Sequence, residues 1–105
     1  MSWRRPRYDP GQVADLARDG KVLASRRVAG WLMNHDYDAA DTLVAVLGSL
    51  EPSGRWLGSC RLANGETADE YEVHINGEDW YLKFYLDLEQ VVVIVWSCWW
   101  EGAAH

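Results

Sequence analysis

Five polar side chains in the second half of the chain belong to types that move protons or hold charge. His74, Glu72 and Tyr81 can take up or release a proton, and the ordinary pKa of histidine suits proton transfer near neutral pH. Arg61 and Lys83 carry positive charge. The alternative interpretation is an ordinary solvated sheet face, with cross-strand ion pairs and a surface histidine. The elements that position these side chains decide whether they share a surface.

Two Asn-Gly dipeptides predict the strands that carry these residues. Asn64-Gly65 and Asn76-Gly77 separate segments in which apolar and polar residues alternate, the pattern typical of β-hairpins. The apolar segment 91–96 predicts a fourth strand, central or largely covered, that pairs with residues 80–87. The sequence therefore predicts an antiparallel sheet over residues 55–98.

Two-residue turns at both dipeptides fix a register and a buried face. Cys60 then faces Asp69, and Tyr71 faces Leu82, on the side packed against helices; Asp69 is the one polar misfit there. Arg61 lies opposite Ala68 on the other side. The open face is predicted to carry these residues: Arg55, Leu57, Ser59, Arg61, Glu70, Glu72, His74, Tyr81, Lys83, Tyr85, Ile94 and Trp96.

Helices are predicted over residues 9–50. Asp9 before a proline, Ser25, and Asp38 or Asp41 are residues that cap helix N-termini, and Gly48 marks the end of the third helix. The predicted fold is therefore α+β, with N-terminal helices packed on one face of a four-stranded antiparallel sheet. A chain of 105 residues has room for one domain, 1–105.

Charge and composition exclude several function classes. A net charge of −6 has the wrong sign for a general nucleic-acid binder, although residues 1–8 form a basic arm containing Arg4 and Arg5 and a second basic spot lies at Arg26-Arg27. A solvated, frayed terminus is the favoured interpretation of the arm. Histidine and cysteine spacing fits no zinc site, and no phosphate-binding loop is present, so no cofactor is expected. The absence of a long apolar stretch or signal segment predicts a cytoplasmic protein.

Short motifs in a fixed order resemble the MqsR family of toxins from bacterial toxin–antitoxin pairs. They begin with Gly20-Lys21-Val22 and Ser25-Arg26 and continue with Val46-Leu47-Gly48-Ser49-Leu50. The later motifs are Trp56 before Gly58-Ser59, then Asp69-Glu70-Tyr71, the strand Trp80-Tyr81-Leu82-Lys83-Phe84, and the terminal strand from Val92 to Trp96. The resemblance implies a RelE-like fold, and an antitoxin protein and mRNA as partners.

The resemblance also implies a metal-independent ribonuclease, in which a 2′-hydroxyl attacks the adjacent phosphate. Of the family's lysines, glutamine and tyrosine, only the tyrosine is matched, as Tyr81. The lysines fall on Leu57 or Gly58 and on Cys98 or a neighbour, and the glutamine falls on Ala68. Arg61 would then occupy the space of that glutamine.

Two functions follow as hypotheses. In the first, an MqsR-like ribonuclease uses Arg61 and Lys83 on the phosphate, Tyr81 to position or donate, and His74 or Glu72 to move protons. In the second, a non-catalytic protein keeps the scaffold and acts as a regulator, or as a phage-encoded inhibitor of a host protein complex, through charge and tryptophan. RNA or a partner would contact these residues: Arg4, Arg5, Arg26, Arg27, Arg55 and Trp96.

Overall fold

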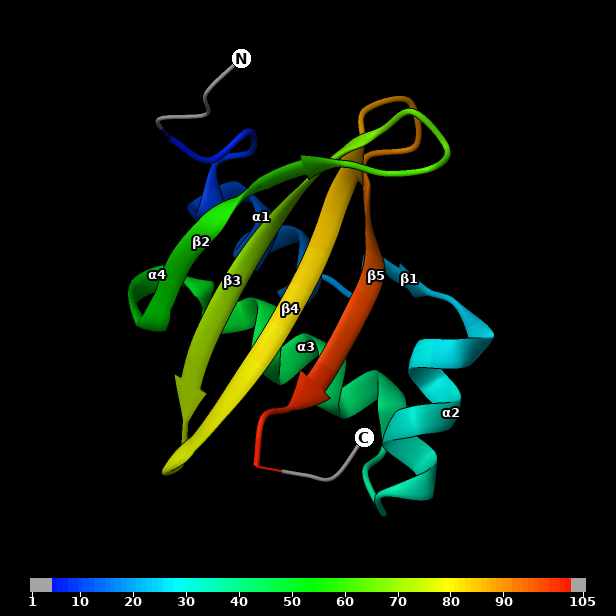
Figure 1. The fold of residues 1–105 in the computed structure, drawn as a ribbon, viewed down its shortest axis with the longest axis vertical. Coiled ribbons are helices and arrows are strands. Elements are labelled where there is room, and N and C mark those ends of the chain that lie inside the picture. The colour runs from blue at the N-terminus through cyan, green and yellow to red at the C-terminus, as the bar shows by residue number, and fades with distance from the viewer. Residues whose placement is uncertain (1–4, 103–105) are drawn as a thin grey trace.

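The computed structural model describes residues 5–102, in which the strands form one mixed sheet with order β1-β5-β4-β3-β2 (Figure 1). The elements are α1 (Pro10–Arg18), β1 (Val22–Ala24), α2 (Arg26–Asn34), α3 (Ala39–Gly48), α4 (Leu50–Ser53), β2 (Gly54–Arg61), β3 (Thr67–Ile75), β4 (Glu78–Asp87) and β5 (Val92–Trp100). The helices lie behind the sheet in Figure 1 and leave its front face open. Among the described residues, no helix is long and apolar enough to cross a membrane.

The predicted α+β class is confirmed, but the sheet has a fifth strand and is not fully antiparallel. β1 pairs in parallel with β5, with Val22 opposite Val93 and Ala24 opposite Val95. A backbone hydrogen bond of 3.0 Å from the Val93 N–H to the Lys21 carbonyl extends this pairing. Three residues are too few to show a strand periodicity, which is why the sequence did not reveal β1. β5 therefore has a neighbouring strand on both sides for part of its length, so the prediction of a central strand is confirmed there.

The predicted helix starts are confirmed. The side chain of Asp9 accepts from the Gly11 N–H at 3.3 Å, and that of Ser25 accepts from the Val28 N–H at 3.2 Å. Asp38, rather than Asp41, caps α3. These caps satisfy backbone donors that the first turn of a helix leaves without partners. The one-turn helix α4 was not predicted.

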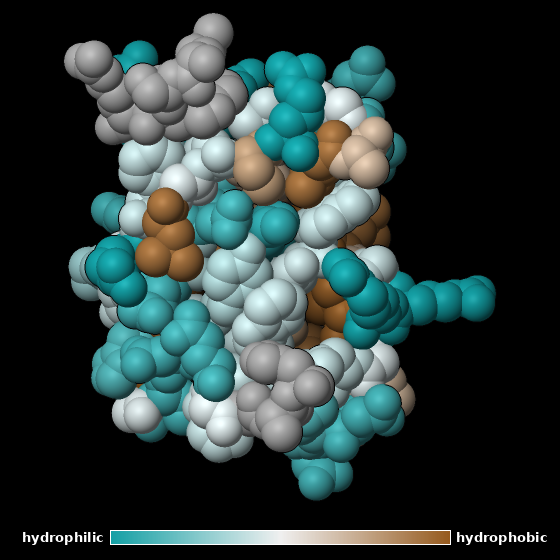
Figure 2. Space-filling model, in the orientation of Figure 1, coloured by the Kyte–Doolittle hydropathy of each residue, from teal (hydrophilic) through white to brown (hydrophobic). Residues whose placement is uncertain are grey.

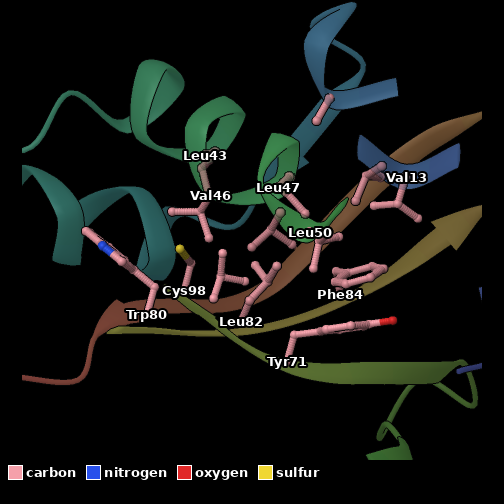
Figure 3. Close-up of a cluster of buried hydrophobic side chains, with 14 of the residues drawn as sticks. Val13, Leu43, Val46, Leu47, Leu50, Tyr71, Trp80, Leu82, Phe84 and Cys98 are labelled. Atoms are coloured by element: carbon pink, nitrogen blue, oxygen red, sulfur yellow. The ribbon is translucent and has the colours of Figure 1, made fainter. Parts of the chain in front are cut away.

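The core lies between the helices and the inner face of the sheet. Figure 3 shows Leu43, Val46 and Leu47 of α3 pointing toward Leu82 and other side chains of the strands. Leu82 and Leu47 have no exposed surface. Burial of this kind stabilises the fold by roughly 25 cal/mol for each Å² of apolar surface removed from water.

The second hairpin has the predicted register. Val73 pairs with Trp80 and Tyr71 pairs with Leu82, both on the core side. Asn76 and Gly77 both have positive φ, 51° and 80°, which is the geometry of a two-residue type I′ turn. The open-face pairs of β3 and β4 are therefore as predicted.

The predicted register of the first hairpin is wrong by one residue. Only Gly65 has positive φ there, at 88°, and the Leu62 N–H donates to the Glu66 carbonyl, so the loop has three residues instead of two. Cys60 consequently pairs with Ala68, and Arg61 with Thr67. This shift exchanges the two faces of residues 58–61.

A bulge at Leu57 then reverses the exchange in the first part of β2. The register shifts between Trp56 and Gly58, so Trp56 pairs with Tyr71 on the core side and Arg55 stays on the open face. Leu57 is 44% exposed at the bulge, and Gly58 has φ of 145°.

Asp69, the polar misfit of the predicted core face, holds the chain segment before α1. Its carboxylate accepts from the backbone N–H groups of Arg7 and Tyr8, each at 2.9 Å, and from the Ser59 hydroxyl at 2.5 Å. The Tyr8 hydroxyl also donates to the Thr67 carbonyl at 2.8 Å. The interpretation of residues 1–8 as a frayed arm is therefore wrong for Arg7 and Tyr8.

Candidate functional site

The open face of the sheet carries most of the predicted catalytic residues and faces the viewer in Figure 2. The register places Glu70 beside Lys83, and Glu72 beside Tyr81, on neighbouring strands. Strands β3 and β4 thus bring four side chains to one surface, in the arrangement that the second Asn-Gly turn predicts. Figure 2 shows this surface as mainly hydrophilic, with pale aromatic side chains between the charged ones.

Tyr81 is held by two neighbours on this face. Its hydroxyl donates to the Glu70 carboxylate at 2.6 Å, and its ring stacks on Trp99 of β5 with centroids 4.6 Å apart. Burial and this hydrogen bond to Glu70 raise the pKa of Tyr81 above its usual value. The phenol of Tyr81 therefore stays protonated near neutral pH, donates to Glu70, and is a poor general base.

Glu72 is held by Arg55 of the edge strand. The Arg55 guanidinium donates to the Glu72 carboxylate at 2.8 Å, which lowers the pKa of Glu72. The pKa of neighbouring Glu101 is raised by burial and by its hydrogen bond with Glu72. Glu72 is thus an ionised partner of an arginine, and Arg55 already has a carboxylate partner within the protein.

Two of the predicted catalytic residues, His74 and Arg61, lie apart from Tyr81. His74 Nδ1 is 2.7 Å from the Asp79 carboxylate at the turn end of the second hairpin, where both side chains are exposed. Arg61 was predicted on the open face, and this is wrong, because the three-residue loop turns it to the same side as Ser59. Arg61 therefore cannot occupy the place beside Ala68 that the resemblance implies; Cys60 does.

Cys60 is a member of this face that the predicted register hid in the core. Its thiol lies close to Glu70 and Lys83, and burial, followed by the hydrogen bond with Glu70, raises its pKa, while Lys83 opposes this. Cys60 is thus a neutral thiol beside the carboxylate of Glu70. A prediction that assumes a two-residue turn places Cys60 on the core face, because the face of Cys60 depends on the loop length.

The predicted binding arginines divide among different places. Arg27 donates through Nη2 to the Trp96 carbonyl at 2.9 Å, which joins α2 to β5. Trp96 is the extra residue of a second bulge, opposite the step from Lys83 to Phe84. Arg5 and Arg26 are exposed, and Arg4 lies outside the described residues.

Carboxylates outnumber cations on the open face. The alternation of the strands places Glu70, Glu72, Asp79, Asp87 and Glu101 there, together with the cations Arg55 and Lys83 and the histidine His74. A surface of this sign repels phosphate and attracts positively charged groups.

A cavity of about 400 Å³ lies between α2 and the part of β5 that β1 does not cover. Its lining residues are Arg27, Val28, Trp31, Ser97, Cys98 and Trp99. Figure 2 shows a brown recess in this position, between the pale surface of β5 and the hydrophilic side chains of α2. β1 ends at Ala24, so it does not pair with β5 beyond Val95. Helix α2 lies against the remaining edge of β5 and leaves the cavity between them. The sequence shows that α2 and β5 both carry apolar residues, but it does not show that a cavity separates them.

Comparisons of the chain with protein-family models, with curated proteins and with solved structures gave no match. Within residues 5–102, no group of three or more histidine, cysteine, aspartate or glutamate side chains is placed to hold a metal ion.

Proposed function

We propose that this chain is a non-catalytic binding protein whose open sheet face contacts a basic segment of a partner protein. The observation that carries the proposal is the pairing of the polar groups on that face with one another. Tyr81 donates to Glu70, and Arg55 donates to Glu72, so these groups build a fixed surface. A catalytic site would instead aim a proton donor and acceptor at a shared point in the substrate.

The charge of the face supports a cationic partner. Carboxylates flank the stacked rings of Tyr81 and Trp99, so a lysine or arginine side chain would find ionic partners and aromatic surface together. The stack also presents a rigid aromatic area, of the kind that is enriched at protein interfaces. The host protein complex considered above is a partner of this type if it presents a basic segment.

The second candidate is the MqsR-like ribonuclease with a RelE-like fold, acting in the cytoplasm under an antitoxin. It is favoured by the position of Tyr81 and Lys83 on the same face, two residues apart on β4. It requires Tyr81 to leave Glu70, and it lacks Arg61, which lies on the other side. Loss of one positioned donor or charge costs about 10²–10³-fold in rate, so this candidate predicts weak activity.

One experiment separates the two candidates. The purified protein is titrated with a lysine decamer by calorimetry and is incubated with mRNA at increasing ratios. We expect saturable peptide binding and no RNA cleavage. The double variant Glu70→Gln/Glu72→Gln should bind about 5–20-fold more weakly, because two charge contacts are lost.

The matched control removes two carboxylates from the helical layer, as Asp19→Asn/Asp36→Asn. Both side chains are exposed and belong to the helical part of the chain. Equal weakening by both double variants would contradict the proposal, because it would mean that binding follows total charge. Cleavage of mRNA that is lost in Tyr81→Phe would establish the ribonuclease instead.

A further inference from the structure

We propose that the cavity between α2 and β5 binds a small, planar aromatic compound with a single carboxylate. The cavity, at about 400 Å³, falls within the size range of small-molecule sites, roughly 300–1,000 Å³. Its lining is almost entirely apolar surface of aliphatic and aromatic side chains, and Arg27, whose guanidinium is bound to the Trp96 carbonyl, is the one cationic residue beside it. This inference does not depend on the function proposed above.

The aromatic walls of the cavity are held in place by a second layer of rings. Trp31 stacks on His35 with ring centroids 4.0 Å apart, and His35 Nδ1 forms a hydrogen bond of 2.8 Å with the Trp31 carbonyl. Trp99 stacks on Tyr81, whose hydroxyl is fixed by Glu70. Walls held in this way lose little conformational entropy when a flat ring lies against them. The geometry therefore favours a planar aromatic body.

Arg27 supplies the charge that selects an anion. Its Nη2 donates to the Trp96 carbonyl at 2.9 Å, which fixes the guanidinium at the rim. A guanidinium has five N–H donors, and that bond uses one, so a carboxylate can be bound through the others. An anionic group on the ligand would thus meet an oriented partner.

The remainder of the lining offers no second charge. Val28 and Cys98 are buried, and burial raises the pKa of the Cys98 thiol to about 12, so the thiol stays neutral. Ser97 is uncharged and also buried. A dicarboxylate would leave its second anionic group in an apolar environment without a partner, and a cation would face Arg27, so both are disfavoured. An aromatic monocarboxylate therefore matches this cavity best, with its ring against the apolar walls and its one charge at Arg27.

The test uses 2-naphthoate as the probe and 2-naphthalenemethanol as its neutral counterpart, titrated by calorimetry and by ¹H–¹⁵N NMR. We expect 2-naphthoate to bind at least 10-fold more tightly than the alcohol and to shift the amide signals of residues 27–31 and 97–99. The variant Arg27→Gln should weaken 2-naphthoate at least 10-fold and remove the difference between the two probes. Arg26→Gln, an exposed neighbour on the same helix, should leave both affinities unchanged.

Three outcomes would overturn the proposal. The first is no binding of 2-naphthoate up to millimolar concentration by the folded wild-type protein. The second is equal affinity for the alcohol, which would assign the cavity to an uncharged apolar group such as a side chain of a partner protein. The third is equal weakening by Arg26→Gln and Arg27→Gln, which would assign binding to general charge. Thermal melting of each variant checks that it is folded.

Discussion

The carboxylate of Asp69 accepts a hydrogen bond of 2.9 Å from the backbone N–H of Tyr8, although the two residues are 61 positions apart. Asp69 is fully buried on β3, and Tyr8 precedes the first helix. This contact attaches the start of the helical layer to the sheet. It also explains why a charged residue occupies a core position: the carboxylate has donors from both the incoming chain and Ser59.

Replacing Asp69 should therefore destabilise the protein markedly. In Asp69→Ala the buried N–H of Tyr8 and the Ser59 hydroxyl lose their acceptor, and we expect the free energy of unfolding to fall by about 2–4 kcal/mol. Urea denaturation followed by tryptophan fluorescence measures this change. Asp19→Ala, at an exposed aspartate, should stay within about 0.5 kcal/mol of wild type. Similar losses for the two variants would contradict the role given to Asp69.

The bulge of β2 predicts a contrast between two glycines. Gly58 has φ of 145°, a conformation that is costly for any residue with a Cβ, and nothing lies within 4 Å of a Cβ built there. Gly58→Ala should therefore lower stability by about 1–3 kcal/mol through backbone strain alone. Gly30 also has open space, but it lies in α2, where alanine is the better helix former. Gly30→Ala should raise stability by up to about 1 kcal/mol, and a loss there would contradict this account.

The buried hydroxyl of Tyr71 is an unsatisfied polar group in the core. It has no hydrogen-bond partner among the described residues, while the Tyr71 ring stacks on Phe84 with centroids 5.9 Å apart. Tyr71→Phe keeps the ring and removes the unsatisfied hydroxyl, so we expect unchanged or higher stability, by up to about 1 kcal/mol. A loss above 1 kcal/mol in thermal or urea denaturation would mean that the hydroxyl has a partner. Tyr71→Leu, which removes the stacked ring, is the destabilising control.

The two cysteines should differ in reactivity and in their effect on stability at high pH. Burial raises the pKa of Cys98 to about 12 from its ordinary value of 9.0. Iodoacetamide at pH 8 should thus label the half-buried Cys60 first and Cys98 only after unfolding. Mass spectrometry of the labelled peptides identifies the order.

The same shift sets a pH window for stability. Between pH 9 and 12 the thiol of Cys98 ionises in the unfolded chain and not in the folded one, so the folded state loses stability as pH rises. Wild type should lose more stability over this window than Cys98→Ala, which lacks the group. Tyr71 and Tyr81, whose pKa values are also raised, act alike in both proteins. Parallel pH profiles for the two proteins would contradict the assignment.

The two Asn-Gly turns show where a local signal suffices and where it does not. The same dipeptide forms a two-residue turn at Asn76-Gly77 and part of a three-residue loop at Asn64-Gly65. In the hairpin at Asn64-Gly65, Ser59 must lie on the core side to reach Asp69, and Asp69 in turn binds the chain before α1. This requirement is a tertiary contact, which no pattern within the hairpin contains. The site prediction failed for Arg61 and missed Cys60 for this reason.

The parallel pairing of β1 with β5 has a consequence for synthesis of the chain. Val22 pairs with Val93, so β1 has no partner in the sheet until β5, the last strand of the sheet to be synthesised, has been made. The helical layer, by contrast, is complete in sequence by Ser53. A nascent chain of intermediate length therefore exposes the unpaired edge of β1 and the apolar faces of its helices. Such intermediates are prone to aggregation, and pairing across so many residues slows the final folding step.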